Sequence, residues 1–469
     1  MTRLPCFLMT LALAGCASAP PYSRPELDIP AAYKEAPAGW TTASPADAQE
    51  RGPWWTLFGD PQLDALAAQA QSANQDIAAG IAAYDQARAI VREQRASLWP
   101  SVNASSGATR SGGTNVGNSD SGTGTGNRYQ FNVGASWAPD LFGLLRKAVG
   151  STEARAQASA ANLASVRLAI IGEVATQYLS LRETDAEAAL LRDTIAAYER
   201  SLQIARNRYD AGIAPKSDLL QAQTQLANAQ ADLAGLGRQR AQLEHAIAVL
   251  VGRAPGGFSL APTPWKAEAI PVMPGSVPSV LLQRRPDIAA AERNVAAANA
   301  QIGVARAGYF PSLTLNASDG FSASRVADLF DAGAWSLGLS LVQTVFDAGA
   351  TRARVAQSRA AWQQAVAQYR QAVLTAFREV EDQLAAQQAL EQQYMLRREA
   401  AQASDLTEQQ MMNRYRAGQV SFSEVVQAQV SALTARRTLV QLTGSRQAAA
   451  VALIQALGGG WQVGEAETP

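Results

Sequence analysis

The sequence predicts an α+β membrane protein in which long helices and paired strands are built twice along one chain. Three observations carry this prediction. Stretches of about 60 residues have helical periodicity and no proline, other segments alternate apolar with small polar residues, and two sets of motifs recur at a nearly constant offset. Alanine, roughly a fifth of the 469 residues, favours helices in close contact.

The composition excludes several classes of function. Forty basic and forty acidic residues leave no net charge, whereas nucleic-acid-binding proteins carry a basic excess. His245 is the only histidine, so no histidine cluster is available for a metal and histidine acid–base chemistry has little support. The sequence also has no nucleotide-binding loop or catalytic constellation, and it therefore predicts neither an enzyme nor a cofactor or metal site.

The N-terminus has the features of a secretory signal. Residues 1–15 combine Arg3, an apolar stretch too short to span a bilayer, and small residues before a cysteine. Leu13–Cys16 resembles the lipobox of bacterial lipoproteins, which predicts a covalent lipid on Cys16; the alternative is an ordinary signal peptide with a chance cysteine. Ala17 and Ser18 stand where inner-membrane retention signals usually place Asp, which implies sorting to the outer membrane.

The mature chain is expected to begin with a tether and a capped helix. Residues 16–59 are rich in Pro, Ala and Ser and predict an extended segment, lipidated at its start. Asp60 is expected to cap a single helix over about 61–98. Pro100 and, in the second half, Pro311 mark the positions where helix gives way to strand.

Each half is expected to carry a pair of strands. Apolar and small polar residues alternate over 129–137 and again over 335–341, and shorter strands are expected near 102–105 and 313–317. The Gly- and Ser-rich stretch 105–127 predicts a long exposed loop. The alternation fits strands with lipid on one face and water on the other, and it fits a half-buried strand of a soluble sheet equally well.

A long helix and a shorter return helix follow each strand pair. The first long helix is expected over about 144–207, on the order of 90 Å, and the second over about 350–413. Each ends in a glycine turn, at Gly212 and at Gly418. A heptad seam in the first helix implies a supercoiled partner. The seam consists of Ala188, Leu191, Ile195, Tyr198, Leu202, Ala205 and Tyr209.

An internal duplication divides the chain. Arg208–Gly212 recurs as Arg414–Gly418, and Asp218–Gln223 recurs as Glu424–Gln429, both at an offset of 414 − 208 = 206. Ala96–Val102 matches Ala307–Leu313 at an offset of 307 − 96 = 211. The expected division is a signal peptide (1–15), a tether (16–59), a first repeat (60–251), an equatorial linker (252–285), a second repeat (286–457) and a tail (458–469).

The strands are the only elements expected to cross a membrane. No segment after Cys16 is expected to have the apolar length of a transmembrane helix. Four strands cannot close a barrel, because the smallest known barrels have eight, and open sheet edges do not occur in lipid. A barrel would therefore be shared between several chains, and the long polar helices would lie in water.

These motifs resemble the TolC-like outer-membrane factor family, in its lipoprotein branch typified by OprM and NodT, the outer-membrane subunits of RND-type tripartite efflux systems. The resemblance covers nearly all of the mature chain and implies a homotrimer, with a 12-stranded transmembrane β-barrel continuous with a 12-helix periplasmic α-barrel. It also implies a periplasmic adaptor and an inner-membrane pump as partners. The matching segments are Pro21–Pro25, Trp54–Asp64, Asp140–Gly143, Leu282–Ile288, Ala291–Arg293, Ile302–Ala307, Phe310–Leu313 and Val345–Gly349.

The resemblance places the glycine turns at the periplasmic tip, where the family narrows its tunnel and meets its partners. In a trimer, Asp218 and Glu424 would supply six carboxylates, a ring that favours cations and pairs with basic residues in a closed state. Glu424 also fits a capping box with Ser421, and Asp218 fits an acid in the first turn of a helix. A role in the gate and a role in helix capping therefore both stay open for these residues. The candidate partners of the carboxylates are Arg208, Tyr209, Arg414 and Tyr415.

One departure from the family bears on this gate. Family members often carry a second acid three residues after the first, where this chain has Gln221 and Gln427. A gate here would depend less on charge and more on amide hydrogen bonds.

The function implied is a passive exit duct that carries small toxic or amphipathic compounds across the outer membrane, driven by a partner pump. Two alternatives remain: a duct for type I protein secretion and a non-conducting, lipid-anchored periplasmic scaffold. The lipobox and Arg284–Ile288 favour efflux, and the alternating strands argue against a scaffold.

Overall fold

A computed structural model describes residues 22–27, 33–35, 53–114, 123–271 and 285–459. Two compact units emerge from the contacts within the chain, and each draws segments from both halves of the sequence. One, here called the sheet unit, is built mainly from Ala82–Ala160 and Ala290–Arg370. The other, the helical unit, is built mainly from Ala161–Ala289, Gln371–Pro469 and the segment ending at Ile81.

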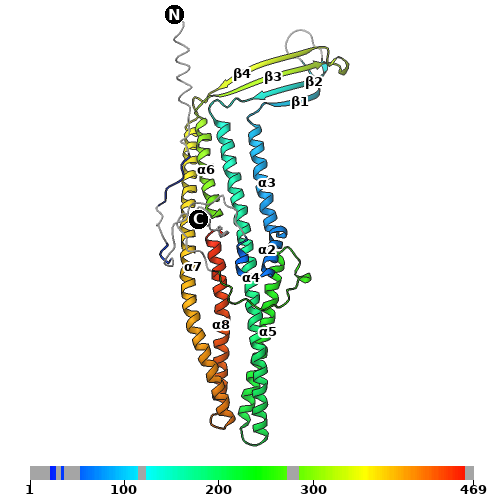
Figure 1. The fold of residues 1–469 in the computed structure, drawn as a ribbon. Coiled ribbons are helices and arrows are strands. Elements are labelled where there is room, and N and C mark those ends of the chain that lie inside the picture. The colour runs from blue at the N-terminus through cyan, green and yellow to red at the C-terminus, as the bar shows by residue number, and fades with distance from the viewer. Residues whose placement is uncertain (1–21, 28–32, 36–52, 115–122, 272–284, 460–469) are drawn as a thin grey trace, which may run out of the picture. The chain divides into compact units, whose positions relative to one another are not determined.

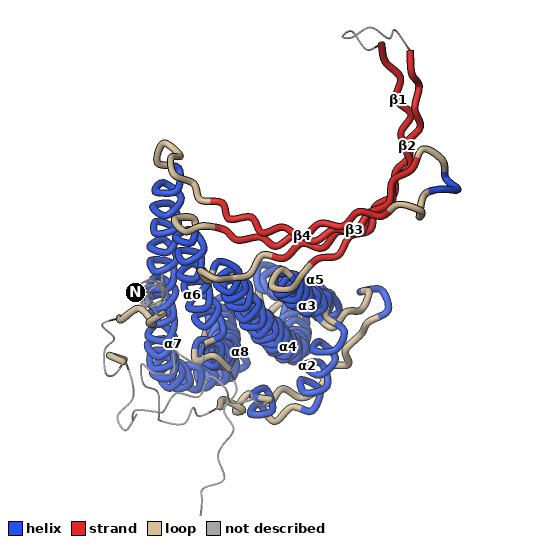
Figure 2. The backbone as a smooth tube through the Cα atoms, turned by 90° about the horizontal axis from the view of Figure 1, so that it is seen from above, coloured by secondary structure: helices blue, strands red, loops and turns tan. Residues whose placement is uncertain are grey.

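The sheet unit contains four antiparallel strands in chain order, β1-β2-β3-β4 (Figure 1). Their bounds are Ser101–Thr114, Thr123–Trp137, Ser312–Ala323 and Gly333–Val342. The ribbon of strands follows a curved path (Figure 2). Among the described residues, the outer edges of β1 and β4 pair with no other strand. The sheet is therefore open at both sides.

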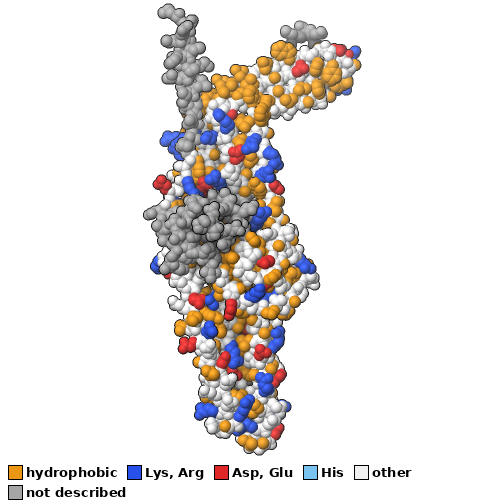
Figure 3. Space-filling view, viewed as in Figure 1, with side chains coloured by type: hydrophobic (Ala, Val, Ile, Leu, Met, Phe, Trp, Pro, Cys, Tyr) orange, Lys and Arg blue, Asp and Glu red, His pale blue; other side chains and the backbone are white. Residues whose placement is uncertain are grey.

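The strand register collects the apolar side chains on one face. Phe131 lies opposite Phe321, and Leu315 lies between Trp137 and Leu339, so residues that alternate along each strand align across the sheet. This confirms the alternation expected for β2 and β4. The apolar residues stay exposed, Leu337 at 73%, and hydrophobic side chains cover much of the visible sheet surface (Figure 3).

Two expected strand boundaries are wrong. The stretch 105–127 is not one long loop, because β1 runs to Thr114 and β2 starts at Thr123. The two strands pair residue by residue up to Thr114 opposite Thr123. The ladder uses backbone groups that every residue except proline supplies, so small side chains do not prevent it. β3 likewise continues beyond the expected 313–317, to Ala323.

The helix expected over 61–98 is also wrong as a single element. It is divided into α2 (Pro61–Ala73) and α3 (Gln75–Ala96) at Asn74, which is buried. The Asn74 side chain accepts the backbone N–H groups of Asp76 and Ile77 at 2.9 and 3.0 Å, which caps α3. Its amide donates to the Leu250 carbonyl at 2.8 Å, so a tertiary contact fixes the break.

The remaining helices have matching lengths in the two halves. α4 (Leu144–Asp210) and α7 (Ala350–Arg416) each have 67 residues, and α5 (Lys216–Leu250) and α8 (Phe422–Ala456) each have 35. α6 (Pro286–Ala307) has 22, as does α3. Three short 3₁₀ segments complete the described elements: Trp54–Phe58, Pro255–Gly257 and Val326–Asp328.

One helix is apolar enough to cross a membrane by length and composition. α4 contains an 18-residue stretch with at most two charged residues, of which 28% is buried. The expectation that no such segment follows Cys16 is therefore wrong for α4. The stretch has many alanines and aliphatic residues and few charged ones, so its mean hydropathy is high. Its Ile171 and Val174 lie in the core of the helical unit, so this single stretch is weak evidence for a membrane span.

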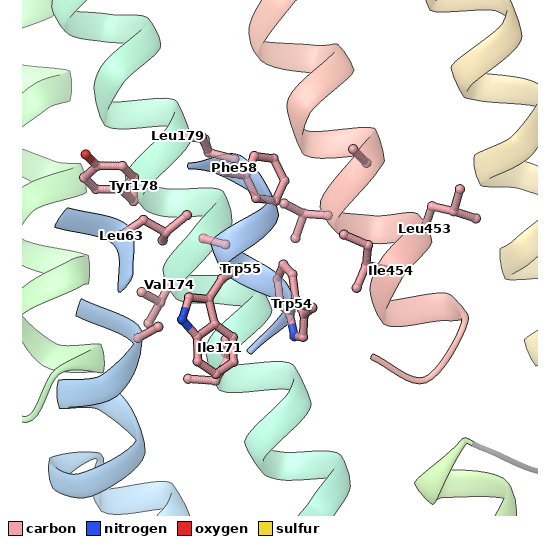
Figure 4. Close-up of a cluster of buried hydrophobic side chains, with 14 of the residues drawn as sticks. Trp54, Trp55, Phe58, Leu63, Ile171, Val174, Tyr178, Leu179, Leu453 and Ile454 are labelled. Atoms are coloured by element: carbon pink, nitrogen blue, oxygen red, sulfur yellow. The ribbon is translucent and has the colours of Figure 1, made fainter. Parts of the chain in front are cut away.

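The core of the helical unit forms around the segment that precedes α2. Trp54, Trp55 and Phe58 are buried against α4 and the end of α8, where Leu453 and Ile454 lie (Figure 4). Burial of these aromatic rings removes a large apolar area from water and fixes the segment on the helices.

The cap expected at Asp60 is confirmed. Its side chain accepts the Gln62 backbone N–H at 2.9 Å and also accepts the Tyr178 hydroxyl at 2.7 Å. Arg182, 1% exposed, lies 4.8 Å from the Tyr178 ring and donates to the Gln62 side chain at 3.0 Å. Asp60, Gln62 and the Tyr178 hydroxyl are thus paired beside the aromatic core, whereas the Nε atom of Arg182 has no partner among the described residues.

α4 and α8 pack through two reciprocal glycine contacts. A Cβ atom at Gly172 of α4 would collide with Gln455 of α8, and one at Gly444 of α8 would collide with Glu183 of α4. The two contacts lie 11 residues apart on each helix, 183 − 172 and 455 − 444. Burial, and then the charge of Glu187, raise the pKa of Glu183 to about 7.

We predict that packing of α4 on α8 weakens as the pH rises through 7. The folded chain binds the Glu183 proton more tightly than the unfolded chain, whose glutamate has a pKa near 4.5. Protonated Glu183 therefore makes its full contribution to the stability of the folded chain below pH ~4.5, and this contribution is lost above pH ~7. Glu183→Gln should flatten this pH dependence, measured by hydrogen exchange of α8 amides between pH 5 and 8. Glu173→Gln, at an exposed site on the same helix, is the control and should leave the dependence intact.

Candidate functional site

The two hairpin turns of the helical unit share one backbone geometry. Gly212 ends the turn after α4 with φ +70°, and Gly418 does so after α7 with φ +73°. In the first turn Gly212 donates to Tyr209 at 2.9 Å and Ile213 donates to Arg208 at 2.8 Å, and the same two bonds recur around Gly418. This pair of bonds is a Schellman motif, which needs a left-handed residue that glycine adopts at least cost.

Tyr415 joins the two hairpins. Its side chain is 2% exposed and its ring centre lies 5.1 Å from that of Phe422 at the start of α8. The guanidinium of Arg208, at the end of α4, lies 4.7 Å from the Tyr415 ring and donates to the Tyr415 carbonyl at 3.0 Å. The Tyr415 hydroxyl donates to Asp218 at the start of α5, at 3.3 Å. The Tyr415 ring thus contacts α8 and the end of α4, its carbonyl accepts from α4, and its hydroxyl donates to α5.

The electrostatic surroundings keep the Tyr415 hydroxyl protonated. Burial raises the pKa of this phenol and the Asp218 carboxylate raises it further, while the Arg208 charge opposes them. A protonated phenol is the form that donates to a carboxylate. Asp218 is therefore held by a neutral donor, not by an ion pair.

Glu424 caps its own helix. Its carboxylate accepts the Ser421 backbone N–H at 3.3 Å and the Ser421 hydroxyl at 3.1 Å, in a capping-box arrangement at the start of α8. Within the described residues it contacts neither Arg208 nor Tyr415. The structure therefore brings Arg208, Tyr415 and Asp218 together and leaves Glu424 outside that cluster.

The other candidate residues are exposed. Tyr209, equivalent to Tyr415 in the duplication, is 38% exposed, whereas Tyr415 is buried. Arg414, Gln221 and Gln427 also lie on the surface, and their side chains make no hydrogen bond or ion pair within the part of the chain that the structure describes. The equivalent positions of the two repeats thus have different surroundings in one chain.

Several polar contacts along the hairpins, some of them buried, were missed by the sequence reasoning. Gln429, 3% exposed, donates to Ser201 of α4 at 3.2 Å. Arg437 of α8 pairs with Glu187 of α4 at 2.6 Å and with Asp232 of α5 at 2.9 Å. Nothing in the residue types distinguishes these positions from solvated helix faces.

A pair of ion pairs recurs with the duplication. Arg240 pairs with Asp185 at 2.7 Å, and Arg446 pairs with Glu391 at equivalent positions, since 446 − 240 and 391 − 185 both equal 206. Comparing charges at the repeat offset could have found this pair. Each bond ties a return helix to the long helix of its own hairpin.

The remaining candidates lie elsewhere. Pro100 and Pro311 stand immediately before β1 and β3, where the chain leaves α3 and α6. Arg285, at the start of α6, pairs with Asp287 at 2.8 Å and with Glu379 at 2.7 Å. Cys16 lies outside the described residues.

We predict that Tyr415 stabilises the hairpin turns far more than Tyr209 does. Tyr415→Ala removes a buried ring and should cost about 3–5 kcal/mol locally, whereas Tyr415→Phe loses only the bond to Asp218, about 0.5–1.5 kcal/mol. Tyr209→Ala is the matched control at the exposed equivalent site and should change stability by less than about 0.5 kcal/mol. Hydrogen exchange of amides around both turns measures the effect. Equal responses to the two alanine variants would contradict the role given to Tyr415.

The chain matches known proteins along almost all of its length. The profile of the family described as "Outer membrane efflux protein" matches residues 66–253 and 277–459. The toluene efflux pump outer membrane protein TtgC of Pseudomonas putida is 32% identical over 460 residues, covering 97% of this chain and 95% of TtgC. The cation efflux system protein CusC of Escherichia coli is 30% identical over 459 residues, covering 97% and 98%.

The fold agrees with these relatives. The structure of the outer-membrane channel OprN aligns with a TM-score of 0.86 and 29% identity, covering 95% of this chain and 100% of OprN. The relatives are efflux channels and not enzymes. The chain belongs to the outer membrane efflux protein family and is an efflux channel of the outer membrane.

Proposed function

We propose that this chain is the passive outer-membrane exit duct of a tripartite efflux pump, and that it works as a homotrimer. The main observation that supports this proposal is the four-stranded sheet, which is open at both edges and exposes one apolar face. Lipid does not tolerate unpaired strand edges, so the outer edges of β1 and β4 need strands from other copies. Three copies of four strands make a closed barrel of twelve.

Strand length supports the membrane role. β1 to β4 have 14, 15, 12 and 10 residues, and about 9–11 residues suffice for a tilted strand to cross a bilayer. The apolar face would meet lipid and the polar face would line the pore. Two charged residues lie on the apolar face, Asp319 of β3 opposite Trp335 and Arg110 of β1 opposite Asn127, and both lie toward the connections between strands, away from the helices. A charge costs less near the edge of the bilayer than at its centre.

The helices suit a periplasmic tunnel. α4 and α7 are each about 100 Å long and carry charges along their length, so they belong in water. The matching helix lengths and the recurring Arg–acid pairs support an internal repeat in which each chain supplies two equivalent hairpins. Three chains with four helices each form a wall of twelve helices.

The exported compounds are small toxic or amphipathic molecules, selected by the partners. TtgC is named for toluene efflux and CusC for cation efflux, although both resemble this chain to a similar degree. One duct architecture therefore serves very different cargo. Energy and selection come from an inner-membrane pump, joined to the duct by a periplasmic adaptor.

The hairpin turns form the gate of this duct. Asp218 is held by Tyr415 within the chain, and Glu424 caps α8, so both carboxylates have a structural role beside any effect on ions. Three copies would bring six carboxylates to the tip, where a ring of negative charge favours cations.

Planar-bilayer conductance of the purified protein tests the duct and the gate. We expect cation-favouring channels, and we expect the double variant Asp218→Ala, Glu424→Ala to reduce that selectivity and raise the open fraction, because it removes the ring and releases Tyr415. Asp193→Ala with Glu399→Ala, which removes two exposed acids of the long helices at the same offset of 206 but away from the turns, is the matched control. A scaffold would give no channels in any form. Channels with unchanged selectivity in the double variant would reject the carboxylate gate and leave the duct intact.

We also propose that Cys16 carries the covalent lipid that anchors the chain to the outer membrane. The supporting observation is the lipobox-like segment Leu13–Cys16. Metabolic labelling with a palmitate analogue should mark the wild type and not Cys16→Ala, whereas Cys6→Ala, in the segment expected to be removed, should still be labelled. Labelling that persists in Cys16→Ala would exclude this cysteine.

A further inference from the structure

A cavity of about 390 Å³ lies in the sheet unit where the strands meet the helices. This volume is in the range of small-molecule sites. Its walls come from both halves of the chain: the segment between β2 and α4, the segment between α6 and β3, and the segment between β4 and α7. Phe142 and Phe310 stack in the wall with ring centres 5.1 Å apart and planes within 10°. The interior is mainly apolar.

Three charged groups line this cavity, and one of them, Asp140, is already paired with Arg146, which lies outside the lining. Asp140 accepts two backbone N–H groups at the start of α4 and forms an ion pair with Arg146 at 3.0 Å. This pair leaves no net charge for a ligand.

The other two charges, Asp347 and Arg354, have no ionic partner within the described residues. Asp347 accepts the Gly349 and Thr351 backbone N–H groups and the Thr351 hydroxyl, at 2.6–3.0 Å, but pairs with no cation. Arg354, one to two turns further along α7, is exposed and its side chain makes no hydrogen bond or ion pair. The cavity therefore presents one unpaired negative and one unpaired positive group, the complement of a zwitterion.

The surface around the cavity continues the lipid-facing side of the sheet. Leu339 and Leu341 of β4 are 69% and 64% exposed, Leu313, which lies opposite Leu341 on the same face, lines the cavity, and Phe346 just beyond β4 is 87% exposed. Tyr309 and Trp99, at the same end of the strands, are 50% and 74% exposed. Exposed aromatic residues at strand ends mark the membrane–water interface of barrels.

We propose that this cavity binds a glycerophospholipid with a zwitterionic headgroup carrying a primary ammonium. The phosphate pairs with Arg354, the ammonium donates to Asp347, and the start of an acyl chain packs against Phe142 and Phe310. The inference rests on the proposed barrel, which places this end of the strands at the periplasmic surface of the outer membrane. The bound lipid would seal the junction between barrel and tunnel.

Native mass spectrometry of the delipidated full-length protein tests this site. Phosphatidylethanolamine, phosphatidylglycerol and phosphatidylcholine are added separately at equal concentrations. We expect phosphatidylethanolamine to bind most tightly, since phosphatidylglycerol lacks the ammonium and phosphatidylcholine lacks its N–H donors. Arg354→Gln should weaken its binding about tenfold, the effect of losing one charge-assisted bond. Arg352→Gln is the matched control, because Arg352 is exposed on the same helix outside the cavity. Excess inorganic phosphate should not displace the lipid.

Each contrary result has a distinct meaning. Unchanged binding in Arg354→Gln, equal affinity for the three lipids, or displacement by phosphate overturns the proposal. A wild type that conducts but binds no phosphatidylethanolamine also overturns it, and indicates that a neighbouring copy covers the cavity. Failure of the wild type to form channels in the conductance experiment would instead reject the proposed duct.

Discussion

The pairing of backbone groups at the sheet edges is the constraint on which the rest of this structure depends. In lipid, each unpaired N–H or C=O costs several kcal/mol, so a four-stranded sheet with free edges at β1 and β4 cannot stand alone there. The exposed apolar face of the sheet also requires a partner, because its side chains need to be removed from water. In the proposed trimer, strands from neighbouring copies would pair the edges, and lipid would cover the apolar face.

Within one chain, the duplicated hairpins meet different surroundings, and this asymmetry has a simple cause. Tyr415 packs against residues of both hairpins of its own chain, whereas its equivalent Tyr209 is exposed. Any two-fold repeat in a ring of three chains has one contact within each chain and one between chains. In the proposed trimer, Arg414 of one copy and Tyr209 of a neighbouring copy would meet as Arg208 and Tyr415 do within one chain.

Polar contacts join the helices of the helical unit in addition to its apolar core. Arg437 joins α8 to α4 and α5, Asn74 joins α2 and α3 to α5, and Glu183 lies over the backbone of Gly444. Alanine and glycine bring the helices close enough for these contacts. A chain with no net charge thus contains many local ion pairs between acidic and basic side chains. The lone histidine is consistent with transport without catalysis.

The sequence by itself determined the order of the long helices and the strands and the alternation within β2 and β4, since both depend on local periodicity. It also located both glycine turns, because only glycine adopts their left-handed backbone at little cost. The break at Asn74, the true length of β1, and the cluster of Arg208, Tyr415 and Asp218 were decided by tertiary structure. These features depend on partners distant in the chain, and a residue's type does not reveal which distant group it will meet.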